Sequence, residues 1–286
     1  MKKIVVLTDF SKLSKVAVSY AIGLAKAIEA RIILISVINA GSSPKTLSNW
    51  KKLEEQMIKG AKADADLLLS EVRTEAGTIE ISYDSVLGFP LADVIDKFVA
   101  KNKVDFIVMG TKGATGLRKA LIGSNAAAVI NKSSIPVLVV PGKAQFKNIK
   151  KIVYASDIQN LPDEIKAVAQ FARFFDASID VLHVVQGHSK IDMEELERNM
   201  ARISKEERLI QTAKYPKIQF HVLNSKNISD AVDKFVTEQK ADLLAMFTHR
   251  LDFYEKLFDK SITRQLAFHS KVPMLTSNKT NLKIGK

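Results

Sequence analysis

Short apolar runs alternate with longer segments of helical periodicity along the chain, and this alternation predicts the architecture. In the first half, strands are expected at residues 3–7, 31–38, 78–86, 104–109 and 136–140. Helices are expected between them, near residues 12–29, 46–75, 90–101 and 118–132. Several strand runs are almost continuous Ile, Val and Leu, as in parallel strands covered on both faces. The alternation predicts right-handed βαβ units and a doubly wound parallel sheet.

The second of these helices has one apolar face. Leu47, Trp50, Leu53, Met57 and Ala61 recur at helical spacing and fall on the same side. We interpret this face as part of the core rather than as a binding surface.

The chain contains two related copies of one unit. KIVVLTD at residues 3–9 matches KIVYASD at an offset of 148 residues. The segments KFV at 97–99, VDFIVM at 104–109 and IPVL at 135–138 recur in the same order at an offset of 137. The offset shortens in the middle of the unit, around the second helix and its loops. One unit of about 140 residues, an ordinary domain size, has therefore been duplicated.

The repeat predicts two tandem, doubly wound, five-stranded parallel-sheet domains at residues 1–143 and 147–280. The linker at residues 141–146 is short, so the domains are expected to lie in contact. Of the 286 residues, 47% are hydrophobic, which is enough for a core in each domain. The chain has no cysteine, which excludes disulfides and thiolate metal sites and fits a reducing, cytoplasmic location.

The charge and hydropathy patterns limit the classes of partner. The net charge of +12 is spread over both halves rather than gathered in a tail. We interpret it as a lysine-rich solvated surface and rank nucleic-acid binding last among the functions considered. No apolar run approaches the ~18 residues of a membrane helix, and the beginning of the chain lacks a signal-peptide core. We therefore expect an unprocessed, soluble protein without membrane contact.

A glycine-rich segment at residues 109–125 carries the candidate chemistry. It follows the fourth expected strand. Its last three residues, 123–125, begin with Gly123 and lie where a helix is expected to gain its first turn. Glycine lets the main chain approach a ligand and adopt positive φ, and successive amides can form an anion-binding concavity. A helix N-terminus also favours phosphate. From spacing alone, nucleotide binding and a simple turn with a helix cap are equally supported.

The spacing Gly-x-x-Gly, nine residues, then Gly-Ser, after a strand ending in Met-Gly, resembles the ATP-binding signature of the universal stress protein (UspA) family. IVVLTDFS at residues 4–11 looks like the family's first strand and Asp-x-Ser turn, although Thr8 stands where the family often has proline. Residues 88–90 look like its glycine-proline turn, and residues 135–140 look like its closing strand. The similarity covers nearly the whole chain, twice, as in tandem-type members.

The resemblance implies a Rossmann-like fold of the adenine nucleotide alpha hydrolase type, with sheet order 3-2-1-4-5. It also implies a crevice at the carboxyl ends of the first and fourth strands. There the first domain would hold ATP or another adenine nucleotide, with or without Mg²⁺. Asp9 would contact the adenine or ribose side, unless it is simply a helix cap, and Val37 would lie against the adenine. The ribose and phosphates would be held by Gly110, Gly113, Gly123, Ser124 and Asn125.

The second copy lacks the small residues of this loop. At the offset of 137, bulky side chains replace three glycines: Gly110 becomes Phe247, Gly113 becomes Arg250 and Gly123 becomes Lys260. The phosphate cradle is therefore expected to be absent or filled, although Asp157 remains at the position of Asp9. We predict that the second domain does not bind ATP in the family manner and has a structural or regulatory role.

The leading functional hypothesis is a stress-response module that binds an adenine nucleotide in its first domain. One alternative is a slow ATPase or nucleotidyl hydrolase, but the chain has no Gly-x-x-x-x-Gly-Lys-Ser/Thr loop and shows no nucleophile–base pair. Another alternative is an interaction protein that acts without nucleotide. No catalytic residue is assigned.

Two further expectations concern metals and assembly. All five histidines, His183, His188, His221, His249 and His269, lie in the second half, and we interpret them as structural rather than metal-binding. The last strands of the two domains are expected to pair within one chain as a pseudo-dimer, which would protect both edges. A homodimer of two chains is a further hypothesis.

Overall fold

The computed structural model describes residues 1–39, 50–111, 123–158, 161–186, 215–247 and 272–277. The chain separates into two compact units, unit 1 and unit 2, with the boundary between Phe146 and Lys147. Within the described ranges, no helix is both long enough and apolar enough to cross a membrane. The two units are described one at a time.

Unit 1 is built on a parallel sheet. Its strands are β1 (Lys2–Leu7), β2 (Ala30–Ile38), β3 (Ile81–Leu87), β4 (Phe106–Gly110) and β5 (Val137–Val140). Their order is β3-β2-β1-β4-β5, and every neighbouring pair is parallel. The apolar runs in the central strands β1 and β4 are almost completely buried. The predicted doubly wound sheet and its 3-2-1-4-5 order are confirmed.

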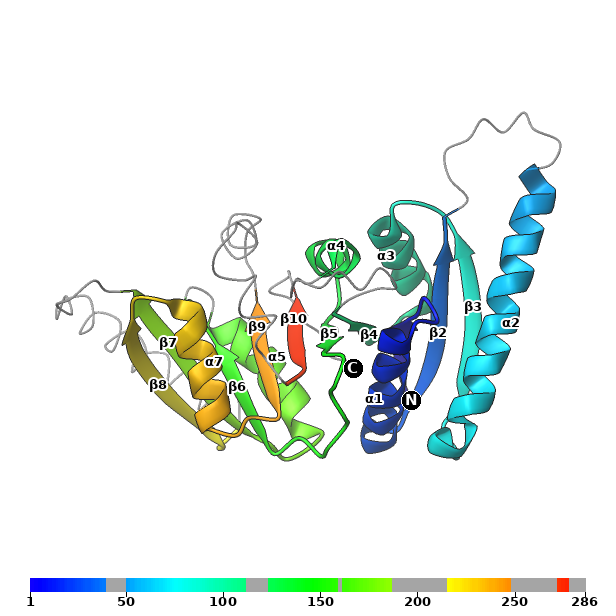
Figure 1. Cartoon of the computed structure of the whole chain (residues 1–286). Helices are drawn as coiled ribbons and strands as arrows, with labels where there is room; N and C mark the ends of the chain where they lie inside the picture. The colour runs from blue at the N-terminus through cyan, green and yellow to red at the C-terminus, as the bar shows by residue number, and fades with distance from the viewer. Residues whose placement is uncertain (40–49, 112–122, 159–160, 187–214, 248–271, 278–286) are drawn as a thin grey trace. The chain divides into compact units, whose positions relative to one another are not determined.

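The helices of unit 1 cover both faces of this sheet. They are α1 (Lys12–Ile28), α2 (Trp50–Ala76), α3 (Leu91–Asn102) and α4 (Ser124–Lys132). Helix α1 packs on β1, β2 and β4 and touches α2, whereas α3 packs against α4 (Figure 1). Connections through α1 and α2 run toward one edge of the sheet, and those through α3 and α4 run toward the other. Because such crossovers are right-handed, the two pairs lie on opposite faces, and the direction changes between β1 and β4.

Three predicted element boundaries in unit 1 were wrong by two residues or more, and the first is β4, which begins at Phe106 rather than at residue 104. Strand β3 begins at Ile81 rather than at residue 78, because a C-terminal turn of α2 occupies the intervening residues. In that turn the amide of Gly77 donates to the carbonyl of Arg73, and Gly77 has a φ of +62°. The helix expected over residues 118–132 does not pass through Gly123, whose ψ of 149° is extended, so α4 begins one residue later.

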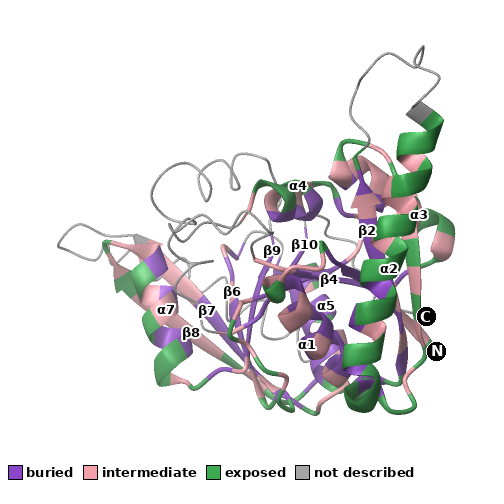
Figure 2. Ribbon diagram, turned by 45° about the vertical axis from the view of Figure 1, so that its right-hand side comes forward, coloured by how far each residue is buried: buried purple, intermediate pink, exposed green. Residues whose placement is uncertain are grey.

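The core face predicted for the second helix was wrong at its beginning. The buried residues of α2 are Ala65, Leu68, Val72 and Ala76, and Met57 and Ala61 are half-buried on the same side. Continued toward the N-terminus, this spacing reaches residue 54, so Leu53 lies one position out of phase and is 44% exposed. Leu47 and the side chain of Trp50 lie outside the described residues. Exposed residues line the outer side of α2 (Figure 2).

Unit 2 repeats the architecture of unit 1. The described strands are β6 (Lys151–Ala155), β7 (Ser178–Gln186), β8 (Ile218–Ser225), β9 (Leu243–Phe247) and β10 (Met274–Ser277). The described helices are α5 (Leu161–Arg173) and α7 (Ile228–Glu238). The strand order is β8-β7-β6-β9-β10, again with parallel neighbours, which is the order of unit 1.

The two units also share individual backbone contacts. In unit 1, Oδ2 of Asp105 accepts a hydrogen bond of 2.8 Å from the amide of Lys3. In unit 2, Oδ2 of Asp242 accepts one of 3.0 Å from the amide of Lys151. Each aspartate therefore joins the beginnings of the two central strands of its unit. The residues that the sequence repeat aligns make the same contact in both units.

Two helix glycines of unit 1 are expected to respond in opposite ways to replacement by alanine. A Cβ on Gly23 would lie 2.5 Å from ring carbons of Phe146, whereas a Cβ on Gly60 would meet nothing within 4 Å. We expect Gly23→Ala to destabilise unit 1 by about 1–3 kcal/mol through overpacking. Gly60→Ala should stabilise it by about 0.5–1 kcal/mol by lowering backbone entropy in the unfolded chain.

Urea unfolding at micromolar protein concentration measures both effects. The fluorescence of Trp50, the single tryptophan of the chain, follows unit 1 because this residue lies at the beginning of α2. The double variant Gly23→Ala/Phe146→Leu should regain part of the lost stability. Equal midpoints for Gly23→Ala and Gly60→Ala would contradict the assigned contact.

Candidate functional site

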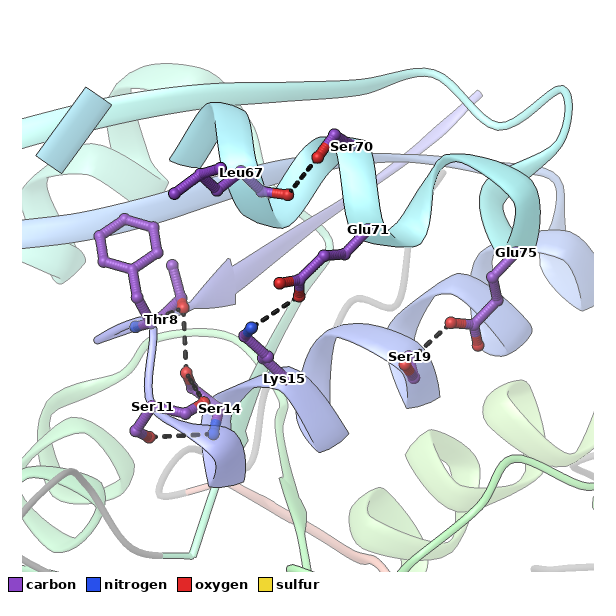
Figure 3. A network of polar contacts seen from close by, with 10 residues as sticks. Thr8, Ser11, Ser14, Lys15, Ser19, Leu67, Ser70, Glu71 and Glu75 are labelled. Carbon is purple, nitrogen blue, oxygen red and sulfur yellow. Dashed lines mark hydrogen bonds and ion pairs between the residues drawn. The ribbon is translucent and has the colours of Figure 1, made fainter. Parts of the chain in front are cut away.

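The turn between β1 and α1 is held by a chain of hydroxyl groups. The amide of Phe10 donates to Oγ1 of Thr8 at 3.0 Å, and Oγ of Ser14 donates to the carbonyl of Ser11 at 2.9 Å. Oγ1 of Thr8 and Oγ of Ser14 are 3.1 Å apart. Since the single hydroxyl proton of Ser14 is already donated, Thr8 is the donor in this contact (Figure 3). The turn is therefore closed by four groups linked in series, which strengthen one another in a buried setting.

Thr8 also ties the turn to the neighbouring strand. Its amide donates to the carbonyl of Ile35 in β2 at 2.9 Å. A proline at this position has neither the amide proton nor the hydroxyl, so the departure from the family pattern adds hydrogen bonds at the end of β1. The chain then passes through Phe10 with a φ of 60°, a left-handed conformation that few side chains adopt.

Asp9 lies at the tip of this turn and is exposed. Its Oδ1 accepts a hydrogen bond of 3.1 Å from the amide of Ser11. The N-cap of α1 is Ser11 itself, whose hydroxyl accepts from the amide of Ser14 at 3.2 Å. The alternative in which Asp9 is the helix cap was therefore wrong, because the cap is Ser11. Asp9 instead stabilises the turn that precedes the cap.

Gly110 lies beside the end of β1. Val6 pairs with Val108 in the parallel ladder, and two more residues along each strand bring Thr8 and Gly110 level. Gly110 is the last residue of β4 and pairs with Val140 of β5. The carboxyl ends of β1 and β4 therefore meet at the switch point of the sheet. The last residue of β4 there is Gly110, which has no side chain.

The loop after β4 returns to its starting point. The amide of Thr111 donates to the carbonyl of Val140 at 3.1 Å, and the carbonyl of Thr111 accepts from the amide of Gly123 at 2.8 Å. These two bonds hold the N-terminus of α4 at the end of β4. Sequence reasoning did not single out Thr111, because its contribution comes from main-chain atoms. Gly113 lies outside the described residues.

Among the described residues, no side chain caps the N-terminus of α4. Gly123 is its N-cap residue, with φ −59° and ψ 149°, and it makes no side-chain cap hydrogen bond. Ser124 and Asn125 form the beginning of the first turn and are exposed. The first amides of a helix have no partner within the helix, so this end presents N–H groups and the positive end of the helix dipole. Gly123 has negative φ, so the backbone conformation does not itself require a glycine here.

Val37 lies on the strand next to the switch point. It is half-buried in β2 and pairs with Val86 of β3. The last residue of β1, Leu7, pairs with Ile35, so Val37 stands two residues beyond the end of that ladder. Strand register thus places Val37, Asp9 and Gly110 at the same carboxyl edge. The Thr111 contacts place Gly123, Ser124 and Asn125 next to the end of β4.

Unit 2 keeps the turn of unit 1 at the corresponding strand. The amide of Ser156 donates to the carbonyl of Leu182 at 2.9 Å, and Oγ of Ser156 accepts from the amide of Ile158 at 3.0 Å. Ile158 has a φ of 60°, the same value as Phe10. The turn that carries Asp157 is therefore built in the same way, with serine in the place of Thr8.

The end of β9 differs from the end of β4. Phe247 replaces Gly110, is only 8% exposed, and packs edge-on against Tyr154 with ring centroids 5.7 Å apart. The hydroxyl of Tyr154 donates to Oε2 of Glu164, a second buried residue. Side chains therefore fill the end of β9, where the corresponding residue of unit 1 is a glycine. Arg250 and Lys260 lie outside the described residues.

Sequence reasoning missed the Tyr154–Glu164 pair. Both side chains are almost completely buried in unit 2. The repeat shows Tyr154 at the position of Val6, and the burial pattern of α5 sets Glu164 at the position of Ala17. A carboxyl group on the apolar stripe of a helix was the available signal, because such groups are seldom buried without a partner.

Two histidines lie within the described residues, on strands of unit 2. Nδ1 of His183 is 2.9 Å from the carbonyl oxygen of Ser156, and Nε2 of His221 is 3.2 Å from Oδ1 of Asp180. No group of three or more His, Cys, Asp or Glu side chains arranged for a metal ion occurs in the described ranges. His188, His249 and His269 lie outside them.

These features define a class of protein with two doubly wound α/β domains, the first of which has a glycine, Gly110, at the switch point of its sheet. A sequence model described as "Universal stress protein family" matches residues 1–141 and again residues 148–277. A universal stress protein of Methanocaldococcus jannaschii is 36% identical over 143 residues, which cover 49% of this chain and 81% of that relative. The chain belongs to the universal stress protein family and carries the family domain twice.

Solved structures extend the likeness of fold. A universal stress protein from Archaeoglobus fulgidus DSM 4304 has a TM-score of 0.69 at 18% identity, covering 98% of this chain and 97% of its own. A universal stress protein solved in complex with cAMP is 29% identical and covers 49% of this chain and 96% of its own, with a TM-score of 0.37. The first shows that the fold is shared over both domains.

The hydroxyl chain at the end of β1 predicts a stability difference between two variants of Thr8. Thr8→Val keeps the side-chain shape but leaves the amide of Phe10 and the hydroxyl of Ser14 without their partner, so we expect a loss of about 2 kcal/mol. Thr8→Ser keeps the hydroxyl, as unit 2 does at Ser156, and should lose about 1 kcal/mol or less. Trp50 fluorescence during urea unfolding measures both. Equal losses would show that the hydroxyl does not close the turn.

The buried Tyr154 predicts a pH-dependent stability of unit 2. Burial, followed by the nearby Glu164 carboxyl group, raises the pKa of Tyr154 well above its usual value of 10.0. Its contribution is therefore complete below the unfolded pKa near 10 and is lost as the pH rises through the higher folded pKa. Above pH ~10 the wild type should lose about 1.4 kcal/mol per pH unit through this group, whereas Tyr154→Phe should not.

Comparing the wild type with Tyr154→Phe isolates the contribution of Tyr154 to the free energy of unfolding. Below pH 10, Tyr154→Phe should be less stable by about 1–3 kcal/mol, because the buried Glu164 loses its donor. The difference should then shrink as the pH approaches 11. This difference is measured from urea midpoints followed by circular dichroism. The transition of unit 2 is the one that circular dichroism detects and the fluorescence of Trp50, in unit 1, does not. A difference that stays constant from pH 8 to 11 would contradict the assignment.

Proposed function

We propose that unit 1 binds an adenine nucleotide, with ATP as the first candidate, at the carboxyl edge of β1, β2 and β4, and that unit 2 does not bind one in this manner. The protein then acts as a stress-response binding module whose first domain carries the nucleotide. Family membership supports the general class, and the local geometry supports the division between the two units.

The observation that carries this proposal is the contrast between Gly110 and Phe247. The two residues occupy the same position at the switch point of their sheets, one without a side chain and the other with a buried ring. A phosphate group can approach the main chain only where side chains leave room for it. Unit 1 has a glycine at this point, whereas unit 2 has Phe247 packed against Tyr154, which supports binding in unit 1 alone.

The uncapped N-terminus of α4 provides the second half of the site. Its free amides and the dipole of the helix favour an anion. The bond from Gly123 to Thr111 holds this end beside β4. In the proposed complex the amides of Ser124 and Asn125, together with the hydroxyl of Ser124, hold the phosphates, and Gly123, whose own amide donates to Thr111, contributes by having no side chain. Gly113 would contribute through the segment that the described ranges do not include.

The nucleoside would lie on the side of β1 and β2. The carboxylate of Asp9 is exposed at the tip of the β1–α1 turn and accepts hydrogen bonds, as a ribose or adenine donor requires. Val37, on the adjacent strand, offers an apolar surface to the base. Mg²⁺, if bound, would be held mainly by the phosphates themselves, since Asp9 is the one acidic side chain among the proposed site residues.

Binding rather than hydrolysis fits the residues of this edge. All five histidines of the chain follow residue 182, so none belongs to unit 1 and no imidazole of that unit can act as a general base. The proposed phosphate contacts are main-chain amides and one hydroxyl, which orient an anion without activating a water molecule. We therefore propose a nucleotide-binding role without rapid turnover.

Substitutions exchanged between the two units test the proposal. Isothermal titration with ATP should give one site per chain for the wild type. Gly110→Phe, which introduces the residue of unit 2, should weaken binding about 100-fold or more, equivalent to ~2.7 kcal/mol. Gly113→Arg should have a similar effect. Phe247→Ala, a control in the other unit, should leave the affinity of unit 1 unchanged.

Circular dichroism of each variant separates lost binding from lost folding. A wild type that binds two nucleotides, or a Gly110→Phe variant that binds as tightly as the wild type, would contradict the assignment of the site. A folded wild type that binds no adenine nucleotide at millimolar concentration would exclude the function itself.

A further inference from the structure

The turn between β3 and α3 lies at the carboxyl edge of the unit 1 sheet, next to the end of β2 (Figure 1). Val86 of β3 pairs with Val37 of β2, and the amide of Gly88 then donates to the carbonyl of Ile38 at 3.1 Å. Gly88 has a φ of 151°, which few side chains adopt, and the chain changes direction there. Phe89 is the next residue. The turn therefore stays bound to the strand that carries Val37.

The connection through α3 leads this turn toward the candidate site. In unit 1 the strand order is β3-β2-β1-β4, so a chain that passes from β3 to β4 must cross both β2 and β1. At the far end of α3, the carbonyl of Asn102 accepts a hydrogen bond of 2.6 Å from Nζ of Lys3 in β1. Helix α3 therefore runs from the carboxyl end of β3 to the amino end of β1. The turn with Phe89 begins this crossing over the strands that would carry the nucleoside.

The side chain of Phe89 is 75% exposed. Among the described residues it is the single exposed phenylalanine or tyrosine. One exposed apolar residue is ordinary on a protein surface, so exposure by itself indicates no ligand. The position of this ring is more specific, because it lies at the carboxyl edge and follows a turn that is bound to the end of β2.

Unit 2 has neither the ring nor the length of this turn. Three residues separate β3 from α3, whereas two residues, Lys226 and Asn227, separate β8 from α7. Oδ1 of Asn227 accepts hydrogen bonds from the amides of Ser229 at 3.0 Å and Asp230 at 3.3 Å, and so caps α7. The N-cap residue of α3, Pro90, makes no side-chain cap hydrogen bond. The turn of unit 2 therefore serves its own helix, and the longer turn of unit 1 presents an aromatic ring to solvent.

We propose that Phe89 stacks on the base of the nucleotide held by unit 1. This inference rests on the proposed function and adds a base-contacting residue to it. Neighbouring strands are ~4.8 Å apart, so the ends of β3 and β4 are separated by about 14 Å. An extended nucleotide can span such an edge, with its phosphates at the N-terminus of α4 and its base near the ends of β2 and β3.

The chemistry of the ring defines what it selects. A phenyl ring offers a flat apolar face without a hydrogen-bonding group, and every nucleobase has a π face that can stack on it. The contact therefore adds affinity for a nucleotide over an inorganic polyphosphate or a sugar phosphate, which have no flat base.

A small ligand fits this ring better than a protein partner does. Leu87, which is 40% exposed, is the other large apolar residue that is exposed in this part of the described chain. Two such side chains provide much less apolar area than a stable protein interface needs. One stacked base, in contrast, needs only one ring.

Isothermal titration of the full chain with ATP and with inorganic triphosphate tests the proposal. Phe89→Ala should weaken the binding of ATP about tenfold or more and leave the binding of triphosphate unchanged within about twofold. Phe89→Leu should lose most of the same affinity, because it remains apolar but has no ring, whereas Phe89→Tyr should retain it. The matched control is Leu67→Ala, which truncates an apolar side chain that is 64% exposed on α2 and should have no effect.

Fluorescence measures the contact directly. Trp50 is the single tryptophan of the chain, so the double variant Trp50→Phe/Phe89→Trp carries its only indole in the turn. ATP should quench this fluorescence with the same dissociation constant that titration gives. Inorganic triphosphate should bind without quenching it.

The results separate failure of this inference from failure of the proposed function. A wild type that binds ATP together with a Phe89→Ala variant that binds it equally tightly would overturn the stacking contact and leave the site in place. An equal loss of ATP and triphosphate affinity in Phe89→Ala, or an indole that ATP does not quench, would also overturn it. A folded wild type that binds neither ATP nor triphosphate would exclude both the function and the contact.

Discussion

The register between β1 and β4 is the constraint on which the candidate site of unit 1 depends. Because Val6 pairs with Val108, the two central strands end level, and the turn after Thr8 begins beside Gly110. The following helices lie on opposite faces of the sheet, so main chain rather than helix surface lines the point where they separate. The hydroxyl chain from Phe10 to Ser11 then fixes the direction in which the chain leaves β1.

The two units share the same strand order and backbone contacts, but they differ in the side chains at the switch point. Asp105 and Asp242 join the central strands in the same way, and Thr8 and Ser156 close the same turn. At the switch point, however, Phe247 stands for Gly110 and packs on Tyr154. One framework can therefore carry a glycine at this position in one unit and a packed aromatic pair in the other, because the framework depends mainly on backbone hydrogen bonds whereas the packing depends on side chains.

Helix α1 connects the candidate nucleotide site with α2. Its N-terminal turn contains Ser14, which belongs to the hydroxyl chain at the candidate nucleotide site. The next residue, Lys15, and Ser19, about one turn further along, bind Glu71 and Glu75 of α2. Helix α1 therefore supports both the turn of the candidate site and the position of α2.

The sequence by itself determined the repeat, the order of helices and strands, and the positions of glycine and of the residues that replace it, because these are properties of local pattern and of alignment. Resemblance to the family added the strand order and the set of site residues, and the structure has confirmed the first while the second stays a prediction. The tertiary structure alone decided the phase of α2, in which Leu53 faces outward. It also decided the packing of Phe247 on Tyr154 and the pairing of Tyr154 with Glu164. An apolar residue one position out of phase still fits a helical pattern. Which side chains meet across a core depends on how distant segments pack, and spacing along the chain does not specify that.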